Sequence, residues 1–134
     1  MDQEWTYEQS TGKLYDSSNK HVATGYSGNG THINKADSQG VKSKGPLPRG
    51  TYTMNEPRKS DKTGAYAMDL TPSPENNMEG RDSFQIHGDN SKGDKSASEG
   101  CIILSRDIRE KMWTSNIHKL KVVDKVSQAK SAEQ

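Results

Sequence analysis

Short runs in which apolar and polar residues alternate recur along most of the chain, and alternation with a period of two predicts half-buried β-strands. The first run, Trp5-Thr6-Tyr7-Glu8, is followed by a turn at 10–13 and a second run, so we expect a hairpin. Gly25 lies inside a third run, as glycine does at a bulge or a close approach of two segments. We expect strands at residues 5–8, 14–15, 21–27, 51–54, 65–70, 83–87, 101–104 and 120–123.

Residues 105–113 instead show the spacing of an amphipathic helix. Ile108 and Met112 are one helical turn apart, and with the tryptophan that follows them they form an apolar face suited to core packing. Asp107 is the predicted N-cap, because Glu110 follows it three residues later, close to a capping box.

Polar segments rich in Gly, Ser, Asn and Lys separate several of the strands. The longest covers residues 29–45, and the stiff, turn-forming segment 45–50, with two prolines, follows it. Loops of this length in a compact domain are usually functional or disordered. The pattern predicts a mainly β fold with one helix directly after the strand at 101–104. Further loops are expected at 55–63, 71–82 and 89–98.

The composition fits a small domain. Of the 134 residues 28% are hydrophobic, and the mean hydropathy is −1.10, so we expect a small core and many loops. One domain is assigned to residues 1–124, with a polar C-terminal tail at 125–134. Disorder is the alternative, but the apolar residues cluster in strand-like runs. The formal net charge is +1 with no basic stripe, which argues against a nucleic acid partner.

The sequence shows neither a signal peptide nor a membrane span. Residues 1–6 lack the basic and apolar regions of a signal peptide, and no apolar run approaches the roughly 20 residues of a membrane helix. We expect no membrane partner, and export by a route that needs no signal peptide.

One cysteine and one histidine carry the strongest chemical signal. Cys101 is the only cysteine, which excludes an internal disulfide and a zinc site with several cysteines. His87 ends an apolar run, and a polar stretch separates it from Cys101. A free thiol with a pKa of about 8.5 is mostly protonated at neutral pH, whereas the nucleophile is the thiolate. An imidazole that titrates near neutrality can take this proton and return it to a leaving amine.

Neighbouring groups fit the same chemistry. Gly100 and Cys101 offer backbone N–H donors for the oxyanion of a tetrahedral intermediate. The imidazole needs a partner for its second nitrogen, and the candidates are the Gly88 carbonyl, another nearby carbonyl and the Asp89 carboxylate.

Purely structural roles are the alternative for both residues. A lone cysteine followed by Ile-Ile-Leu is most often a buried structural residue, and a histidine before glycine often ends a strand. His21, His32 and His118 are not excluded as the base by spacing alone.

Metal sites are weaker alternatives. A calcium loop at 89–100 departs from the EF-hand pattern, since Gly93 stands where a ligand belongs and Asp94 where the glycine belongs. A zinc site would need His87, Cys101 and acids from the loop. We expect neither a metal nor a cofactor.

The segment His87-Gly88, a loop and then Ser98-Glu99-Gly100-Cys101-Ile102 resembles the active-site signature of L,D-transpeptidase catalytic (YkuD-like) domains. In that signature His-Gly is followed by a loop and by Ser/Thr-His-Gly-Cys, an apolar residue and Arg or Asn. Residues 45–52 are similar to the Pro-x-Gly-x-Tyr/Phe strand entry of these domains. A compact branch, which includes the Tlde-type antibacterial effectors of type VI secretion systems, is similar at Tyr7, Thr11, Gly12, Leu14, Tyr26, Ser27 and Gly28.

The resemblance implies an L,D-transpeptidase-like β-sandwich or barrel of short strands with one helix after the cysteine. Carried over by position, it implies that Cys101 is the nucleophile and His87 the general base. Gly88 would supply the carbonyl that orients the imidazole, and Gly100 with Cys101 the oxyanion donors. Ser98 would brace the loop that carries the nucleophile.

Two positions depart from the signature. Glu99 stands where the family has histidine, and Ile103 where it has arginine or asparagine. The thiol is therefore expected to have less positive and less polar surroundings than in the common enzymes, which bears on specificity and rate.

The resemblance implies action on the bond between diaminopimelate and D-Ala in peptidoglycan tetrapeptide stems. Acylation of the thiol would release D-Ala; water as acceptor gives L,D-carboxypeptidase activity, and an amine gives transpeptidation or exchange. We expect an antibacterial toxin that the type VI secretion machinery delivers and that acts in the periplasm of the target cell. The expected partners are peptidoglycan stem peptides and a cognate immunity protein that plugs the groove around Cys101.

Two other functions remain open. A non-catalytic cell-wall or protein-binding module on the same scaffold would explain the missing family histidine at position 99. A general cysteine protease is less consistent with the lack of a larger helical domain.

Overall fold

The computed structural model describes residues 3–28, 33–41, 45–60, 64–78, 84–88 and 100–124. These residues form a mainly β structure with one α-helix, which confirms the predicted fold class. The strands are β1 (Trp5–Glu8), β2 (Lys13–Tyr15), β3 (His21–Thr24), β4 (Tyr26–Ser27), β5 (Gly50–Met54), β6 (Arg58–Ser60), β7 (Gly64–Pro72), β8 (Gln85–His87), β9 (Ile102–Ile103) and β10 (Lys119–Val123), and the helices are the 3₁₀ turn η2 (Ala36–Ser38) and α1 (Arg106–Thr114).

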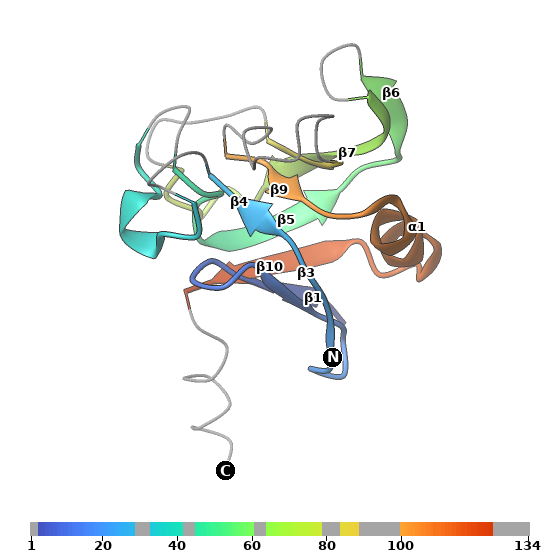
Figure 1. Ribbon diagram of the computed structural model, residues 1–134, viewed down its shortest axis with the longest axis horizontal. Helices are drawn as coiled ribbons and strands as arrows, with labels where there is room; N and C mark the ends of the chain where they lie inside the picture. Colours follow the sequence, from blue (N-terminus) through green and yellow to red (C-terminus); the bar gives the residue numbers. More distant parts are fainter. Residues whose placement is uncertain are drawn as a thin grey trace.

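The strands pair in the order β3-β2-β1-β10-β5-β7-β8-β9-β4, with β6 added beside β7. The expected hairpin of β1 and β2 is present, and β10 lies between β1, to which it is parallel, and β5, to which it is antiparallel. The two ends of the order, β3 and β4, are consecutive in the chain. The sheet therefore curls back on itself, and the half with β1, β3 and β10 lies below the half with β4, β5, β7 and β9 (Figure 1).

Gly25 forms the corner between β3 and β4, inside the run predicted as one strand at 21–27. Its N–H donates to the Gly12 carbonyl oxygen at 2.8 Å. A Cβ atom at Gly25 would lie 1.9 Å from the Ile103 carbonyl oxygen and 2.8 Å from Leu104 Cδ2. Because no side chain fits in that space, the chain crosses from one half of the sheet to the other only with glycine here. The close approach predicted for Gly25 is confirmed.

The core fills the space between the two halves of the sheet and beneath α1. Met112 of α1 is fully buried, and Ile108 and Trp113 pack against the core while partly exposed, as the helical spacing predicted. The remaining members of the core cluster come from the strands and the segments beside them: Trp5, Tyr7, Leu14, Leu47, Tyr52, Met54, Met68, Leu70, Phe84, Ile86, Ile102, Leu104, Leu120 and Val122.

The helix begins where the spacing predicts, but its N-cap differs. Ser105 is the N-cap residue, in an extended conformation and without a side-chain capping hydrogen bond, whereas Asp107 lies within the first turn. The prediction of Asp107 as N-cap is therefore wrong. Its carboxylate still lies near the positive end of the helix dipole, where negative charge is stabilising.

The segment 55–63, predicted to be a loop, contains β6, and Thr71 and Pro72, placed in the next loop, extend β7. β6 has a charged sequence without alternation and pairs only with β7, so its strand conformation depends on that neighbour.

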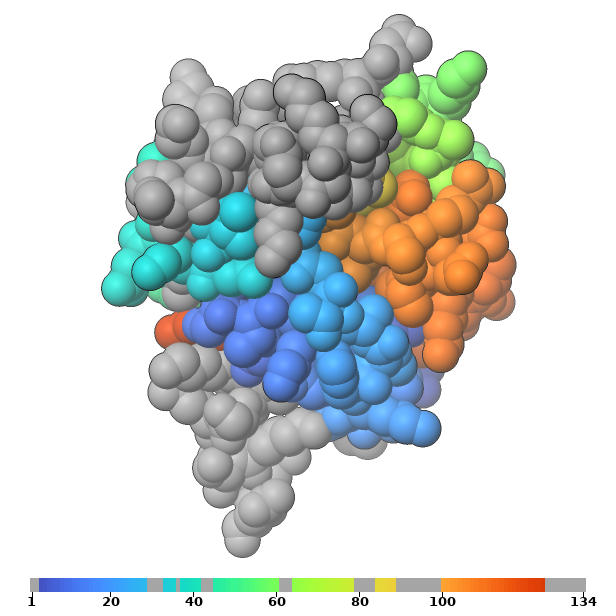
Figure 2. Space-filling model, in the orientation of Figure 1, coloured from blue at the N-terminus to red at the C-terminus, as the bar shows by residue number. Residues whose placement is uncertain are grey.

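Parts of the predicted loops at 29–45 and 71–82, all of the stretch 89–98 and the tail at 125–134 lie outside the described residues. In the part of the chain that is described, no helix is long and apolar enough to cross a membrane. In the space-filling view the segment 20–28 lies between the 33–41 segment and the region of α1 (Figure 2).

Candidate functional site

The parallel pair of β8 and β9 brings the predicted nucleophile and base to neighbouring strands. Ile86 pairs with Ile102 and His87 with Ile103, so Cys101, directly before β9, lies level with Gln85. The backbone N–H of Gln85 donates to Cys101 Sγ at 3.2 Å. Cys101 is a free cysteine of intermediate exposure, so its sulfur is not sealed inside the core. An N–H donor at the sulfur stabilises negative charge that forms there.

His87 ends β8 and is only 3% exposed. Its Nδ1 lies 2.8 Å from the Gly88 carbonyl oxygen. Because a carbonyl oxygen only accepts hydrogen bonds, Nδ1 carries the proton in this contact and Nε2 is left as the basic nitrogen. The His87 carbonyl oxygen accepts from the Leu104 N–H at 3.0 Å, which ties the end of β8 to the residue after β9.

The alternation of the two strands places Cys101 and His87 on the same side of the sheet. Ile86 and Ile102 are fully buried in the core cluster, so their strand neighbours point to the opposite face. Cys101 and His87 occupy diagonal positions on that face of the parallel β8–β9 pair. The register alone therefore brings these two side chains into one neighbourhood.

The peptide that precedes the nucleophile is fixed by a buried serine. Ser27 of β4 is fully buried; its Oγ donates to the Gly100 carbonyl oxygen at 3.0 Å and accepts from the Leu47 N–H at 2.8 Å. Gly100 has a φ of 127°, a conformation that other residues rarely adopt. The C=O and N–H of a trans peptide point in opposite directions, so the Cys101 N–H points away from Ser27.

A polar row continues from the thiol across the sheet to β6. The side chain of Gln85, 8% exposed, donates from Nε2 to Asp69 Oδ1 at 2.8 Å. Arg58 donates to Asp69 from Nε at 2.7 Å and from Nη2 at 3.1 Å. The hydrogen bond from Arg58 is the main reason that the pKa of Asp69 lies below its ordinary value, with that from Gln85 contributing. This row holds Gln85, whose backbone meets the thiol.

The other predicted residues are placed as follows. Gly88 and Gly100 lie beside the histidine and the cysteine, while Ser98 and Asp89 lie outside the described residues. Of the alternative bases, His21 is exposed on β3 with Nε2 3.0 Å from Thr24 Oγ1, and His118 stacks on a tryptophan at 3.9 Å between ring centroids. His32 lies outside the described residues.

Sequence reasoning missed three residues of this neighbourhood: Gln85, Ser27 and Arg109. Gln85 is a polar residue within an apolar run, which is the one signal that marks it. Ser27 was named only among the positions that resemble the compact branch, with no role assigned, and Arg109 carries no signal, since arginine is common on helices. Within the described ranges, no group of three or more His, Cys, Asp and Glu side chains is arranged to hold a metal ion.

Comparison with family models identifies the domain. Residues 21–129, most of the chain and all of the site, match the family model of the Tlde1 domain. No curated protein and no solved structure matches the chain significantly.

Proposed function

The chain belongs to the Tlde1 domain family, a family of type VI secretion effectors, and from this membership we propose that it is a cysteine enzyme that modifies peptidoglycan. Its proposed target is the bond between diaminopimelate and D-Ala in tetrapeptide stems. The observation that carries the proposal is the arrangement at β8 and β9: a partly exposed thiol that accepts a backbone N–H, and a buried imidazole with Nδ1 held by a carbonyl. The resemblance to the L,D-transpeptidase signature supports the choice of substrate.

In the proposed reaction Nε2 of His87 takes the proton of the Cys101 thiol. The sulfur attacks the carbonyl carbon of diaminopimelate, forming the C–S bond while the π electrons of the C=O move onto oxygen. When the tetrahedral intermediate collapses, the C–N bond breaks and the imidazolium gives its proton to the amine of D-Ala. Water then hydrolyses the thioester, or an amine takes the acyl group, which gives carboxypeptidase or exchange activity.

The oxyanion of this intermediate requires donors aimed at it before reaction. The Cys101 N–H is the proposed donor, because Ser27 holds the carbonyl of the same peptide on the opposite side. The protein would thus fix the orientation of one donor from a residue far away in the sequence.

Membership of a type VI effector family is consistent with secretion into target cells. Because the proposed substrate is in the periplasm, we place the activity there and infer that the producing cell needs a cognate immunity protein. Expression with a periplasmic signal peptide should stop growth and deform the cells, whereas cytoplasmic expression should not. Equal toxicity in the two compartments would argue against a cell-wall target.

The direct test is mass spectrometry of muropeptides after treatment with purified protein. The wild type should convert tetrapeptide stems to tripeptides, and Cys101→Ala should not. His87→Ala should be strongly impaired, whereas the matched control His21→Ala, at an exposed histidine, should keep full activity. If neither the wild type nor Cys101→Ala trims stems but both bind peptidoglycan, the protein is a binding module; cleavage of casein would indicate a general protease.

A further inference from the structure

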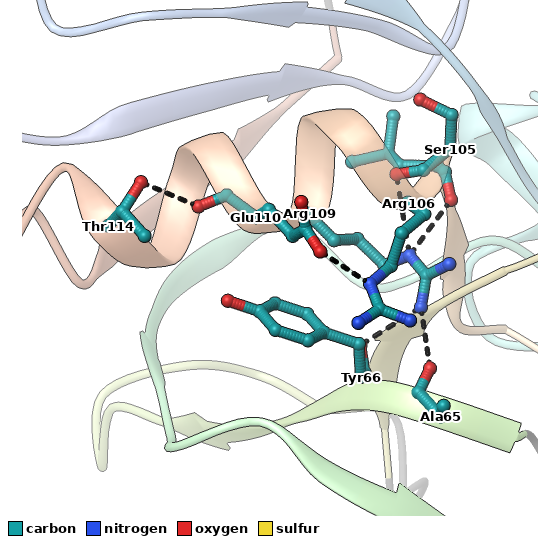
Figure 3. A network of polar contacts seen from close by, with 8 residues as sticks. Ala65, Tyr66, Ser105, Arg106, Arg109, Glu110 and Thr114 are labelled. Atoms are coloured by element: carbon teal, nitrogen blue, oxygen red, sulfur yellow. Dashed lines mark hydrogen bonds and ion pairs between the residues drawn. The ribbon is translucent and has the colours of Figure 1, made fainter.

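Arg109 is a buried cation next to the candidate site. It lies on α1 and is 6% exposed, whereas Arg106 and Lys111 on the same helix are exposed. Among the described residues its guanidinium donates to main-chain carbonyl oxygens: Nε to Leu104 at 3.1 Å and Ser105 at 3.4 Å, and Nη1 to Ala65 and Tyr66 at 2.9 Å each (Figure 3). In the described part of the chain it forms no ion pair.

Burying a charge without an ionic partner costs free energy, which hydrogen bonds to main-chain carbonyls offset only in part. Burial, and secondly the charge of Arg106, lower the pKa of Arg109, which reflects this cost. An apolar residue of similar volume at a helix position facing the interior would normally be at least as stabilising. We therefore look to the contacts of Arg109 for a role besides stability.

The atoms around the guanidinium belong to the backbone that holds His87. A Cβ atom at Gly88 would lie 2.8 Å from Arg109 Nη2, so the guanidinium packs against the residue whose carbonyl oxygen meets the imidazole. Leu104, which accepts from Arg109 Nε, donates its N–H to the His87 carbonyl oxygen. Arg109 thus contacts both backbone partners of His87, and its bonds to Ala65 and Tyr66 anchor it to β7, the neighbour of β8.

We propose that Arg109 is a positioning residue for His87: its rigid guanidinium fixes Gly88 and Leu104, and through them the orientation of the imidazole. The planar fork of arginine can serve carbonyls of β7 and of the β9–α1 junction at once. A lysine keeps the charge, but its single ammonium group cannot reach the carbonyls of β7 and those of the β9–α1 junction at the same time. This inference rests on the proposed role of His87, and its test includes a measurement that needs no peptidoglycan.

The test uses Arg109→Lys and a matched control, Arg106→Lys. Arg106 is on the same helix, with its guanidinium over the Tyr66 ring and an ion pair to Glu110, but it makes no contact with Gly88. For each variant we would measure thermal unfolding, kcat and KM on tetrapeptide stems, and the rate of Cys101 alkylation by iodoacetamide, each also in the His87→Ala background.

We expect Arg109→Lys to fold, to keep KM within about twofold and to lower kcat by about 10- to 100-fold, as small misplacements of a catalytic group do. Alkylation of Cys101 should slow in parallel. In the His87→Ala background the same change should have no further effect on either rate, because Arg109 acts through the imidazole. Arg106→Lys should resemble the wild type.

The inference is overturned if Arg109→Lys lowers the rates equally in the presence and absence of His87, or leaves both rates unchanged. If stems are not cleaved but alkylation shows the predicted dependence on His87, the substrate assignment fails while the role of Arg109 stands. Should Arg109→Lys fail to fold, Gly88→Ala tests the same contact from the other side, since its methyl group displaces the guanidinium; an unchanged alkylation rate in a folded Gly88→Ala protein would overturn the inference.

Discussion

Replacement of Ser27 by alanine removes one oxygen atom from the interior and leaves two main-chain groups without their partner. The Leu47 N–H loses its acceptor, and the Gly100 carbonyl oxygen loses the hydroxyl that donates to it. Ser27, Leu47 and Gly100 are all buried, so water does not readily replace the hydroxyl.

The expected cost follows from these two groups. A buried donor or acceptor left unsatisfied costs about 1–3 kcal/mol, and carbonyl oxygens tolerate the loss better than N–H groups. We therefore expect Ser27→Ala to lower the free energy of unfolding by about 2–3 kcal/mol, which a domain with about 5–15 kcal/mol of stability survives. With the Gly100–Cys101 peptide no longer anchored, kcat on tetrapeptide stems should fall by about tenfold or more with little change in KM.

Urea denaturation and steady-state kinetics measure the two effects, and Ser115→Ala is the matched control. The Ser115 hydroxyl likewise donates to a main-chain carbonyl, of Met112 at 2.7 Å, and accepts a main-chain N–H, of Ile117 at 3.1 Å, but at the far end of α1 from β9. Because Ser115 is exposed and water can replace its hydroxyl, the control should lose less stability than Ser27→Ala, and its kcat should not fall. A loss below about 0.5 kcal/mol in Ser27→Ala, smaller than a typical hydrogen-bond contribution, would show that Ser27 does not hold this peptide. If Ser27→Ala and Ser115→Ala have the same kcat, anchoring of the Gly100–Cys101 peptide is irrelevant to the reaction.

Three further predictions concern the fold around the site. Gly25→Ala should lower the free energy of unfolding by about 3 kcal/mol in urea denaturation, since its methyl group would overlap the Ile103 carbonyl. The control Gly64→Ala, with no atom within 4 Å of the added carbon, should cost only about 1–2 kcal/mol because of its positive φ. Tyr7→Phe should be neutral or stabilising by thermal unfolding, because the Tyr7 hydroxyl is buried with no partner among the described residues and burial raises its pKa; a loss above about 1 kcal/mol would mean that the hydroxyl has a partner. The folded-state pKa of Asp69 is depressed, so the stability that wild type holds over Asp69→Asn should be constant above the ordinary pKa of 3.8 and be lost as pH falls through the lower folded-state value. Because both partners of the Arg58–Asp69 pair are largely exposed, that difference should be small, and an increase on acidification would contradict the assignment.

Much of the fold could be predicted because its strands carry local signals. The alternation in Trp5–Glu8 and the apolar runs before His87 and after Cys101 depend only on neighbouring residues, and each became a strand. Gly25 was also recognisable, because glycine weakens a strand interior and usually marks a bulge or a close backbone approach there. The parallel pairing of β1 with β10 had no such signal, because it joins segments from opposite ends of the chain.

The candidate pair could be picked out from the sequence because its residue types are scarce in the chain. The surrounding residues belong to common types and could not. A single cysteine and a histidine at a strand end stand out in any sequence, and the structure places them on adjacent strands. The side chains of Ser27 and Arg109 hydrogen-bond to the backbone, and Gln85 meets the thiol through its own backbone N–H; these contacts depend on tertiary positions that no local pattern encodes. Arg109 in particular sits on a helix where a charged residue normally faces solvent.

The central claim is that the Cys101 sulfur forms a covalent bond with the peptidoglycan stem. Purified protein mixed with tetrapeptide stems and quenched in acid within the first turnovers is examined by intact-protein mass spectrometry. We predict an adduct with the mass of the stem lacking D-Ala, located on Cys101, released by hydroxylamine and absent from Cys101→Ala. Release of D-Ala by Cys101→Ala at the wild-type rate, with no adduct on either protein, would contradict the account.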